Sequence, residues 1–380
     1  MMMMIVIYAQ FALHAQAYAN NQHKISDEML TNPFLKAMSI CEGTVSILDA
    51  GCVVYSRIWC IFELFKSVMD VNINYAFDVY TEIDGDRRAI GITHGYIPSY
   101  YGNRLIKKLR ESKFPLERII KAINVDVKQA QASVESDRKL ILNTITGRSV
   151  DDAVVDDHDK YDDLNNVLRG IFVTPALERI IKEKDVDTIT RCLDIVKASN
   201  TSIIDLNLED CSRFDDDILI KLADSLPPTL AEFTLWSVRS ALTVNGMNAC
   251  LEKIFGCPQL VRLDLSCNNI GDDGAKQIAD ALKVNQRLKT MSLIGNIIGD
   301  DGAKFIADAL KDNHCLKMLL LSNNSICDDG AKMIADAMKV NHSLKTLFLS
   351  DNKISSDGKE YLSKIKREWK EVDRYLSLQY

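Results

Sequence analysis

The chain of 380 residues lacks the short motifs that mark several common catalytic classes. It has no G-x-x-x-x-G-K-[ST] loop to cradle nucleotide phosphates, no H-E-x-x-H zinc motif and no G-x-S-x-G nucleophile turn. Its ten cysteines include no C-x-x-C pair, which disfavours a zinc site and a disulfide framework and is typical of a reducing compartment. The six histidines are scattered. The sequence therefore predicts no metal and no bound cofactor.

The charge balance and the start of the chain bear on the kind of partner and on the location of the protein. A net charge of −7 disfavours a nucleic-acid partner. The first twenty residues are apolar but lack a basic leading region and are interrupted by Gln10 and His14, so we expect no membrane span and a cytoplasmic protein. Two alternatives stay open for this start: a signal peptide that ends near Ala15-Gln16-Ala17, or an internal piece of a truncated domain.

An acidic stretch from Asp151 to Asp163 offers hard carboxylate ligands for calcium. It lacks the glycine and the distal glutamate of an EF-hand loop, so we interpret it as a solvated surface loop. The segments 176–181 and 187–198 that follow have the pattern of two helices, which would cover the first strand of what comes next.

The C-terminal half repeats itself every 28 residues. This step relates four leucines, four asparagines and four glycines: Leu260, Leu288, Leu316 and Leu344; Asn268, Asn296, Asn324 and Asn352; Gly274, Gly302, Gly330 and Gly358. A fixed period over four units predicts a stacked array.

Each unit combines two hydrophobic periodicities. Leu263-Asp264-Leu265 alternates with period two, as in a short strand, whereas Ala275, Ile278, Ala279 and Leu282 have helical spacing. The helix is expected to begin after Asp272 and Asp273, because acidic groups favour a helix N-terminus. The asparagine between strand and helix is expected to pair backbone groups inside the stack.

These units resemble leucine-rich repeats of the type found in ribonuclease inhibitor and NOD-like receptors. The resemblance implies an α/β solenoid with short parallel strands on a concave face and helices on a convex face, covering residues 201–380. Earlier units are degraded, and their spacing suggests a loop insertion around Thr243 to Asn248. A capping helix from about residue 359, with Leu362, Ile365, Trp369, Val372 and Leu376 at helical spacing, is expected to end the array without another strand.

Strand side chains that point out of the stack would form a broad surface for a protein partner. We align them in three series: Asp205, Glu232, Arg262, Thr290, Met318 and Thr346; Asn207, Thr234, Asp264, Ser292, Leu320 and Phe348; Glu209, Trp236, Ser266, Ile294, Ser322 and Ser350. The predicted binding residues are Trp236, Asp264, Arg262, Ser292, Ile294, Met318, Leu320 and Phe348, and the last apolar members would form an exposed cluster. Alternatively, curvature or the terminal helix buries that cluster.

The N-terminal part has a different pattern. Residues 44–48 are typical of a buried strand and residues 57–69 of a helix, and S-x-x-W-C-x-x-E runs from Ser56 to Glu63. This motif resembles the corresponding helix of TIR domains, and the resemblance implies a smaller α/β, flavodoxin-like domain. Further similar stretches include 20–23, 122–132 and 137–142. The chain lacks the leading strand and Ser-His-Ala-Trp-like segment of that family, so the domain is expected to be incomplete.

In active TIR domains, a glutamate at the position of Glu63 helps to cleave NAD, which makes Glu63 a candidate catalytic residue. A carboxylate suits this chemistry because it can bind a ribose hydroxyl and stabilise an oxocarbenium-like transition state. The structural alternative is that Trp59, Cys60 and Phe62 belong to the core and that Glu63 pairs with Arg57 or Lys66.

The sequence thus predicts a TIR-like domain at 1–173, connecting helices at 174–200 and the solenoid. The leading hypothesis is a protein-binding scaffold for signalling or defence, with self-association through the N-terminal domain as an open addition. NAD cleavage through Glu63 is the first alternative. Regulation of a small GTPase is the second, and it depends on Arg262, the one basic residue in the three series.

Overall fold

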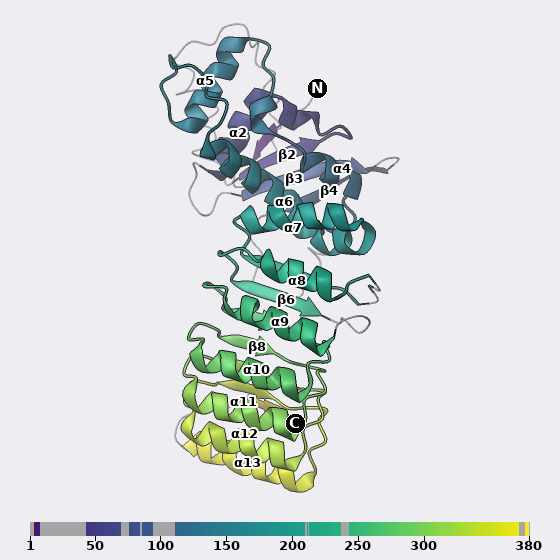
Figure 1. Ribbon diagram of the computed structural model, residues 1–380, viewed down its shortest axis with the longest axis vertical. Coiled ribbons are helices and arrows are strands. Elements are labelled where there is room, and N and C mark those ends of the chain that lie inside the picture. Colours follow the sequence, from purple (N-terminus) through teal and green to yellow (C-terminus); the bar gives the residue numbers. More distant parts are fainter. Residues whose placement is uncertain are drawn as a thin grey trace. The chain divides into compact units, whose positions relative to one another are not determined.

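The computed structural model describes residues 4–7, 43–69, 76–83, 86–93, 111–209, 211, 213–236, 243–371 and 377–379 of the chain (Figure 1). Contacts divide the chain into two compact units, Met1–Arg179 and Ile180–Tyr380. The segment 20–23 that resembles TIR domains and the residues 15–17 of the signal-peptide alternative lie outside the described residues.

The first unit contains a four-stranded sheet in the order β1-β2-β3-β4. Its strands are β1 (Met4–Ile7), β2 (Gly43–Leu48), β3 (Ala76–Ile83) and β4 (Asp86–Thr93). β2 and β3 pair in parallel, whereas β1–β2 and β3–β4 are antiparallel. A strand therefore precedes β2 where the sequence predicted none. The sheet is mixed, and not wholly parallel as in a flavodoxin-like domain.

The described part of the first unit also contains four helices that bury apolar side chains. They are α2 (Ile58–Val68), α4 (Leu116–Ala122), α5 (Glu135–Thr146) and α6 (Asp159–Glu183). The predicted buried strand at 44–48 and the helix at 57–69 are confirmed. Tyr55 and Phe172 are fully buried and meet edge to face, with ring centroids 5.9 Å apart. Helix α6 continues through residue 173 without a break, so segment 176–181 forms part of a long helix.

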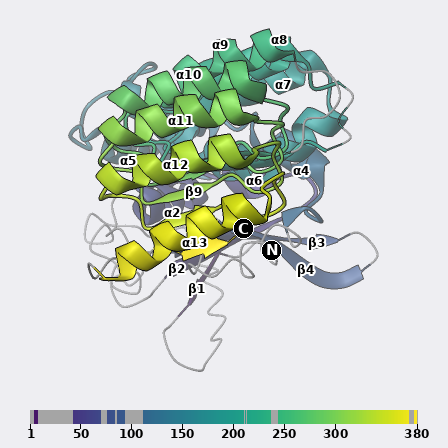
Figure 2. The same ribbon diagram turned by 90° about the horizontal axis from the view of Figure 1, so that it is seen from below.

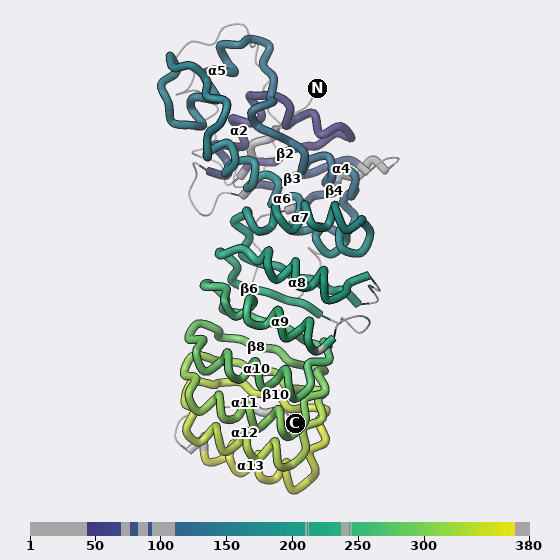
Figure 3. Tube along the Cα trace, in the orientation of Figure 1, coloured from purple at the N-terminus to yellow at the C-terminus, as the bar shows by residue number. Residues whose placement is uncertain are grey.

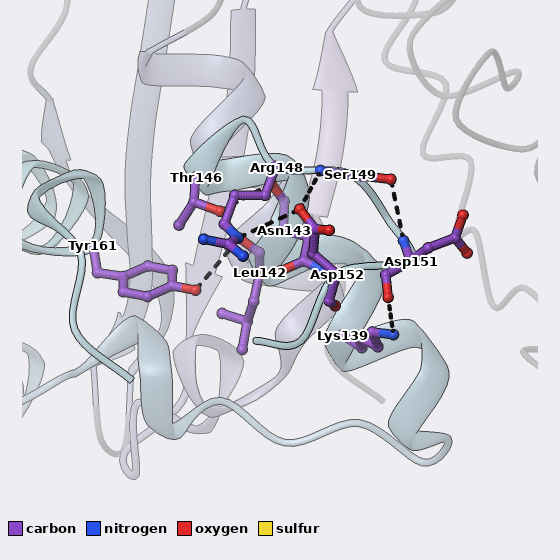
Figure 4. A network of polar contacts seen from close by, with 9 residues as sticks. All are labelled: Lys139, Leu142, Asn143, Thr146, Arg148, Ser149, Asp151, Asp152 and Tyr161. Carbon is purple, nitrogen blue, oxygen red and sulfur yellow. Dashed lines mark hydrogen bonds and ion pairs between the residues drawn. The ribbon is translucent and has the colours of Figure 1, made fainter. Parts of the chain in front are cut away.

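The acidic stretch is tied to α5 instead of being a free loop (Figure 4). The side-chain amide of Asn143 donates to the Asp152 carbonyl at 2.8 Å, and Lys139 Nζ donates to the Asp151 carbonyl at 2.9 Å. The carboxylate of Asp152 accepts from the Ser149 amide. From Asp159 onward the stretch is the first turn of α6, because carboxylates there face a helix N-terminus. The prediction of a surface loop is therefore wrong for residues 159–163.

The second unit stacks helices on one side and strands on the other (Figures 2 and 3). Its helices are α7 (Val186–Ala198), α8 (Asp216–Asp224), α9 (Val244–Phe255), α10 (Gly271–Val284), α11 (Asp300–Asp312), α12 (Asp328–Val340) and α13 (Ser356–Glu371). Its strands are β5 (Ile203–Asn207), β6 (Glu232–Trp236), β7 (Arg262–Asp264), β8 (Thr290–Ser292), β9 (Met318–Leu320), β10 (Thr346–Phe348) and β11 (Ser377–Gln379). The strands form one parallel sheet in reverse chain order from β11 to β5.

Two sequence expectations about this unit are wrong. Thr243 is the N-cap of α9, with its side chain accepting from the Gly246 amide, so residues 244–248 are helical and not a loop insertion. The capping helix begins at Ser356, and a further strand, β11, follows it and pairs with β10. Three added residues suffice for this because a parallel ladder at the end of a sheet offers unpaired backbone groups. Val372 and Leu376 lie outside the described residues.

The core of the second unit follows from the two periodicities. Alternate strand residues are buried between sheet and helices, and Leu263, Met291, Leu319 and Leu347 have no exposed surface. The helices contribute the predicted stripe of Ala275, Ile278, Ala279 and Leu282. Leu362 and Ile365 of α13 are also buried, so this helix closes the end of the core.

The turn asparagines form a ladder from repeat to repeat. Asn296 Oδ1 accepts from the amides of Asn268 and Ile270 in the preceding repeat, at 2.9 and 3.3 Å, and its Nδ2 donates to the Leu265 carbonyl at 2.8 Å. Asn324 makes the same contacts one repeat later, and Asn352 accepts from the Ile326 amide and donates to the Leu321 carbonyl. The predicted backbone role of these asparagines is confirmed.

A second asparagine ladder lies where each helix returns to a strand. Asn313 Oδ1 accepts from the amides of Cys315 and Leu316, while its Nδ2 donates to the carbonyls of Leu282 and Asn285 in the preceding repeat. Asn341 repeats these contacts and is fully buried. The asparagine of the K-x-N sequence is thus a structural residue, and the sequence analysis assigned it no role.

The first aspartate of α10 and of α11 caps the helix of the next repeat. Asp300 Oδ1 accepts from the amides of Cys327 and Gly330 at 2.8 and 3.0 Å, and Asp272 contacts the amides of Gly299 and Gly302 in the same way. The N-cap residues Gly299 and Cys327 provide no side-chain cap themselves. We call this contact the inter-repeat cap. The predicted preference for acidic residues is confirmed, but they lie inside the first turn and act on the neighbouring helix.

Candidate protein-binding surface

The sheet of the second unit presents one face to the helices and the other away from them; we call the latter the sheet face. Helices are about 10 Å wide and strands lie about 4.8 Å apart, so stacking curves the array with the strands on its inner side. The strand register places three columns of side chains on the sheet face. The central column is Asp205, Thr234, Asp264, Ser292, Leu320, Phe348 and Gln379.

This register corrects the sequence alignment at its first member. Asp205 is opposite Thr234, and Asn207 is opposite Trp236, whereas the sequence aligned Asn207 with Thr234. The shift is two residues, so the same side chains still point outward, because strand side chains alternate with period two. Glu209 lies beyond the end of β5 and is exposed. The later members of all three series are paired as predicted where strands contain them.

One end of the sheet face is acidic. Asp205 is exposed, and Glu232 and Asp264 are half-buried. Trp236 follows on β6 with 43% of its surface exposed. Arg262 lies between Glu232 and Thr290 in its column, and Asp264 is the next outward residue on the same strand. We call Asp205, Glu232, Asp264 and Trp236 the acidic half.

Serines connect the two ends. Ser266 Oγ lies 2.8 Å from Ser292 Oγ, and Asp264 Oδ1 accepts from the Ser266 amide at 3.0 Å. Ser292 is 3% exposed, so this predicted binding residue contributes little surface of its own. Further along the face, Ser350 Oγ donates to Ser322 Oγ, one repeat earlier in the same series, at 2.9 Å. These hydrogen bonds hold the middle of the sheet face in place. The sequence analysis predicted no contact for these hydroxyls.

The other end of the sheet face is apolar. Ile294, Met318, Leu320 and Phe348 are all half-buried, and Met318 and Leu320 are consecutive outward residues of β9. Leu320 and Phe348 are opposite each other in the register. The alternative that curvature or the terminal helix fully buries this cluster is not what the structure shows. We call these four residues the apolar half.

The second candidate site is Glu63 on α2. Trp59, one turn earlier on the same helix, donates its indole N–H to Asp137 Oδ2 at 3.2 Å and meets Phe62 edge to face. As the structural alternative expects, Phe62 is buried and Trp59 and Cys60 are half-buried, and the charge of Arg57 acts on the Glu63 carboxyl. Burial raises the pKa of the Glu63 carboxyl to about 7, against a smaller lowering by Arg57. A carboxyl with this pKa can hold or release a proton near neutral pH.

This raised pKa predicts a pH-dependent stability. The folded-state pKa lies above the ordinary value, so the contribution of Glu63 is fully present below about pH 4 and is lost as pH rises through 7. Glu63→Gln should remove this loss and raise the free energy of unfolding at pH 8 by about 2 kcal/mol, a value reduced for the partly exposed carboxylate. Urea titrations at pH 5 and pH 8 measure it, with the exposed Glu117→Gln as control. Parallel pH profiles of Glu63→Gln and the native chain would contradict the prediction.

Several further sequence predictions concern groups outside these two sites. His314 and His342 in the repeat loops are exposed, as expected. The nine cysteines within the described residues are free thiols. Among the described residues, no cluster of three or more His, Cys, Asp or Glu side chains could hold a metal ion. None of the helices in the described ranges combines the length and apolar character needed to cross a membrane.

Comparison with known proteins gives a match to one family model and similarity to solved structures. Residues 256–279 and 340–363 match the family model described as Leucine Rich repeat. Similar solved structures include the tropomodulin C-terminal domain of Caenorhabditis elegans, at 13% identity over 42% of this chain and 96% of that chain, with a TM-score of 0.35. Leiomodin-1 actin-binding site 2 is 18% identical over 50% of this chain and 95% of that chain, with a TM-score of 0.30. No curated protein matches the chain.

The matched segments are two of the units that the 28-residue period defines. Both contain the strand, the turn asparagine and the start of a helix that carries an inter-repeat cap or receives one. Parallel strands on one side, helices on the other and ladders of buried asparagine extend the same arrangement across the second unit. The chain is therefore a leucine-rich-repeat protein, and its second unit is the solenoid.

Proposed function

We propose that this chain is a cytoplasmic protein-binding scaffold that recognises a protein partner through the sheet face of its solenoid. The observation that supports the proposal best is the apolar half, where Ile294, Met318, Leu320 and Phe348 are gathered on one surface without being fully buried. Contiguous apolar side chains on a soluble surface usually mark an interaction site. The ladders beneath them hold this surface rigid, which spares the entropy that a flexible binder loses.

Capture of partners by variant chains tests this location. Leu320→Asp and Phe348→Asp place a charge in the apolar half, so proteins that the native chain retains should be lost, with at least a tenfold drop in recovery. Met333→Asp is the matched control, because Met333 is a 38% exposed apolar residue on α12, on the helix side. Circular dichroism establishes that each variant is folded. Equal recovery of partners by the native chain and the three variants would reject the sheet face as the binding surface.

A role in signalling or defence belongs to the same proposal, with the first unit acting as a TIR-like module that relays or self-associates. Support comes from the S-x-x-W-C-x-x-E helix, which packs its tryptophan against Asp137. Size-exclusion chromatography with light scattering over a concentration series tests self-association, and a monomer at every concentration would reject it.

NAD cleavage is the second candidate, because burial gives Glu63 a pKa of about 7. Such a carboxyl could stabilise positive charge on the ribose and exchange a proton with water. Purified full-length chain should then consume NAD, and Glu63→Gln should reduce the rate by two orders of magnitude or more, as for loss of a general acid–base group. Undetectable consumption by the native chain would leave the scaffold role alone.

A further inference from the structure

The sheet face is divided along its length. Three carboxylates and the exposed indole of Trp236 lie on β5 to β7, whereas the apolar half lies between the end of β8 and β10. Strands lie about 4.8 Å apart, so the five steps from Asp205 on β5 to Phe348 on β10 cover about 24 Å. A partner that contacts both halves therefore needs two different chemistries within that length.

The width of the face limits the shape of the partner. Outward side chains of one strand are about 7 Å apart, so the three columns together span about 13 Å. One α-helix with its side chains is about 10–12 Å wide, and 24 Å of helix contains about 16 residues. The sheet face offers side chains and not a row of backbone groups, so recognition there is of the helix-in-groove kind.

Charge decides the chemistry of the first half. In the columns of the described strands β5 to β7, Asp205, Glu232 and Asp264 carry three negative charges and Arg262 carries one positive charge, so a basic side chain of the partner is favoured there and an acidic one repelled. Trp236 strengthens this preference, because an exposed indole binds a guanidinium or ammonium group over its ring face. The net charge of −7 of the whole chain acts in the same direction on the approaching partner.

We propose that the sheet face binds a helix of about four turns in a protein partner, with Arg or Lys side chains at one end and large apolar side chains at the other. This inference rests on the proposed scaffold function and specifies its partner class. The basic end lies over Asp205, Glu232 and Trp236, and the apolar end lies over Leu320 and Phe348. From β6 to β9 is about 14 Å, or nearly three helical turns, so the two groups are about ten residues apart in the partner.

Three synthetic 16-residue helical peptides test the proposal with the full-length chain by fluorescence anisotropy. The first has Arg at one end and Leu and Phe on the same face at the other. The second replaces Arg with Glu, and the third replaces Leu and Phe with Ser. The native chain should bind the first peptide at least tenfold more tightly than either of the others, and the difference from the second should shrink as salt increases.

Charge reversal of the surface gives the sharper test. The double variant Asp205→Lys/Glu232→Lys should reverse the order of affinities, so that the Glu peptide binds more tightly than the Arg peptide. Glu252→Lys/Glu360→Lys is the matched control, since both residues are exposed on α9 and α13 and the change in net charge is the same. This control should keep the native order. An unchanged order in the first variant, or equal binding of the Arg and Glu peptides by the native chain, would overturn the proposal.

The two proposals fail separately. If Leu320→Asp abolishes the capture of partners while the native chain binds none of the three peptides, the scaffold function stands and the basic–apolar helix is wrong. If the Ser peptide binds as tightly as the first, the acidic half alone recognises the ligand, which also overturns the proposal. Leu320→Ser should lower the affinity for the Arg peptide at least fivefold, and circular dichroism shows whether this variant remains folded.

Discussion

Replacing Asn296 with alanine is expected to lower the free energy of unfolding of the solenoid by about 4 kcal/mol. The Asn296 side chain has no exposed surface and pairs with four backbone groups, the amides of Asn268 and Ile270 and the carbonyls of Leu265 and Ile294. Alanine leaves these groups buried without partners, and each unpaired group costs about 1–3 kcal/mol before the surroundings relax. Urea denaturation of the full chain, followed by circular dichroism, measures the loss.

Hydrogen exchange locates the effect. The amides of Asn268 and Ile270 should lose protection first in Asn296→Ala, because Asn296 Oδ1 accepts from both. Asn245→Ala is the matched control: Asn245 is exposed on α9, and its replacement should change stability by less than about 0.5 kcal/mol. If Asn296→Ala were as mild as this control, the ladder would not be a source of stability.

The fold of the solenoid could be predicted from the sequence because the same physical requirement recurs every 28 residues. Leu263 and its equivalents had to be buried, Asn296 had to pair backbone groups, and helical spacing of Ile278 and Leu282 fixed the other layer. The same pattern occurs in each repeat, so each repeat supports the prediction independently. The first repeat was misaligned by two residues, since strand alternation is unchanged by that shift and no asparagine marked its turn.

The sequence was less informative where a structure depends on contacts between distant segments. Strand β11 has three residues and no pattern of its own, and it exists through its pairing with β10. The second asparagine ladder and the inter-repeat cap were missed for the same reason. Asn313 and Asp300 look like ordinary loop and helix-start residues until their partners in the neighbouring repeat are known. In the first unit, the antiparallel β1 and β4 were not encoded by any motif.

For the candidate binding surface, too, some features could be predicted from the sequence and others could not. Strand alternation predicted that Met318, Leu320 and Phe348 face away from the helices, and the register confirms it. Burial of Ser292 could not be predicted, because it depends on the contact of its hydroxyl with Ser266, which follows β7 in the preceding repeat. The division of the sheet face into an acidic and an apolar half required only the order of the strands, which the period already provided.

The inter-repeat cap predicts a strong coupling between Asp300 and Gly330. A Cβ atom at Gly330 would lie 2.5 Å from Asp300 Oδ1 and 3.0 Å from the Ala303 side chain, so Gly330→Ala must displace the carboxylate that caps α12. We expect Gly330→Ala to cost about 2 kcal/mol, although alanine is ordinarily the better helix former by up to about 1 kcal/mol. Asp300→Ala alone should cost about 1–2 kcal/mol, the usual loss for a helix cap.

The double variant Asp300→Ala/Gly330→Ala distinguishes displacement of the capping carboxylate from steric crowding by other neighbours of Gly330. With the carboxylate removed by Asp300→Ala, the added methyl group at Gly330 loses its nearest neighbour, so the combined loss should be smaller than the sum of the two by at least 1 kcal/mol. Urea denaturation of the four chains gives this coupling. Asp301→Ala is the matched control, because Asp301 is the exposed neighbour in the same turn and should show no coupling to Gly330. Strict additivity of Asp300→Ala and Gly330→Ala would mean that glycine is required there by the packing against Ala303 and Ile326 instead.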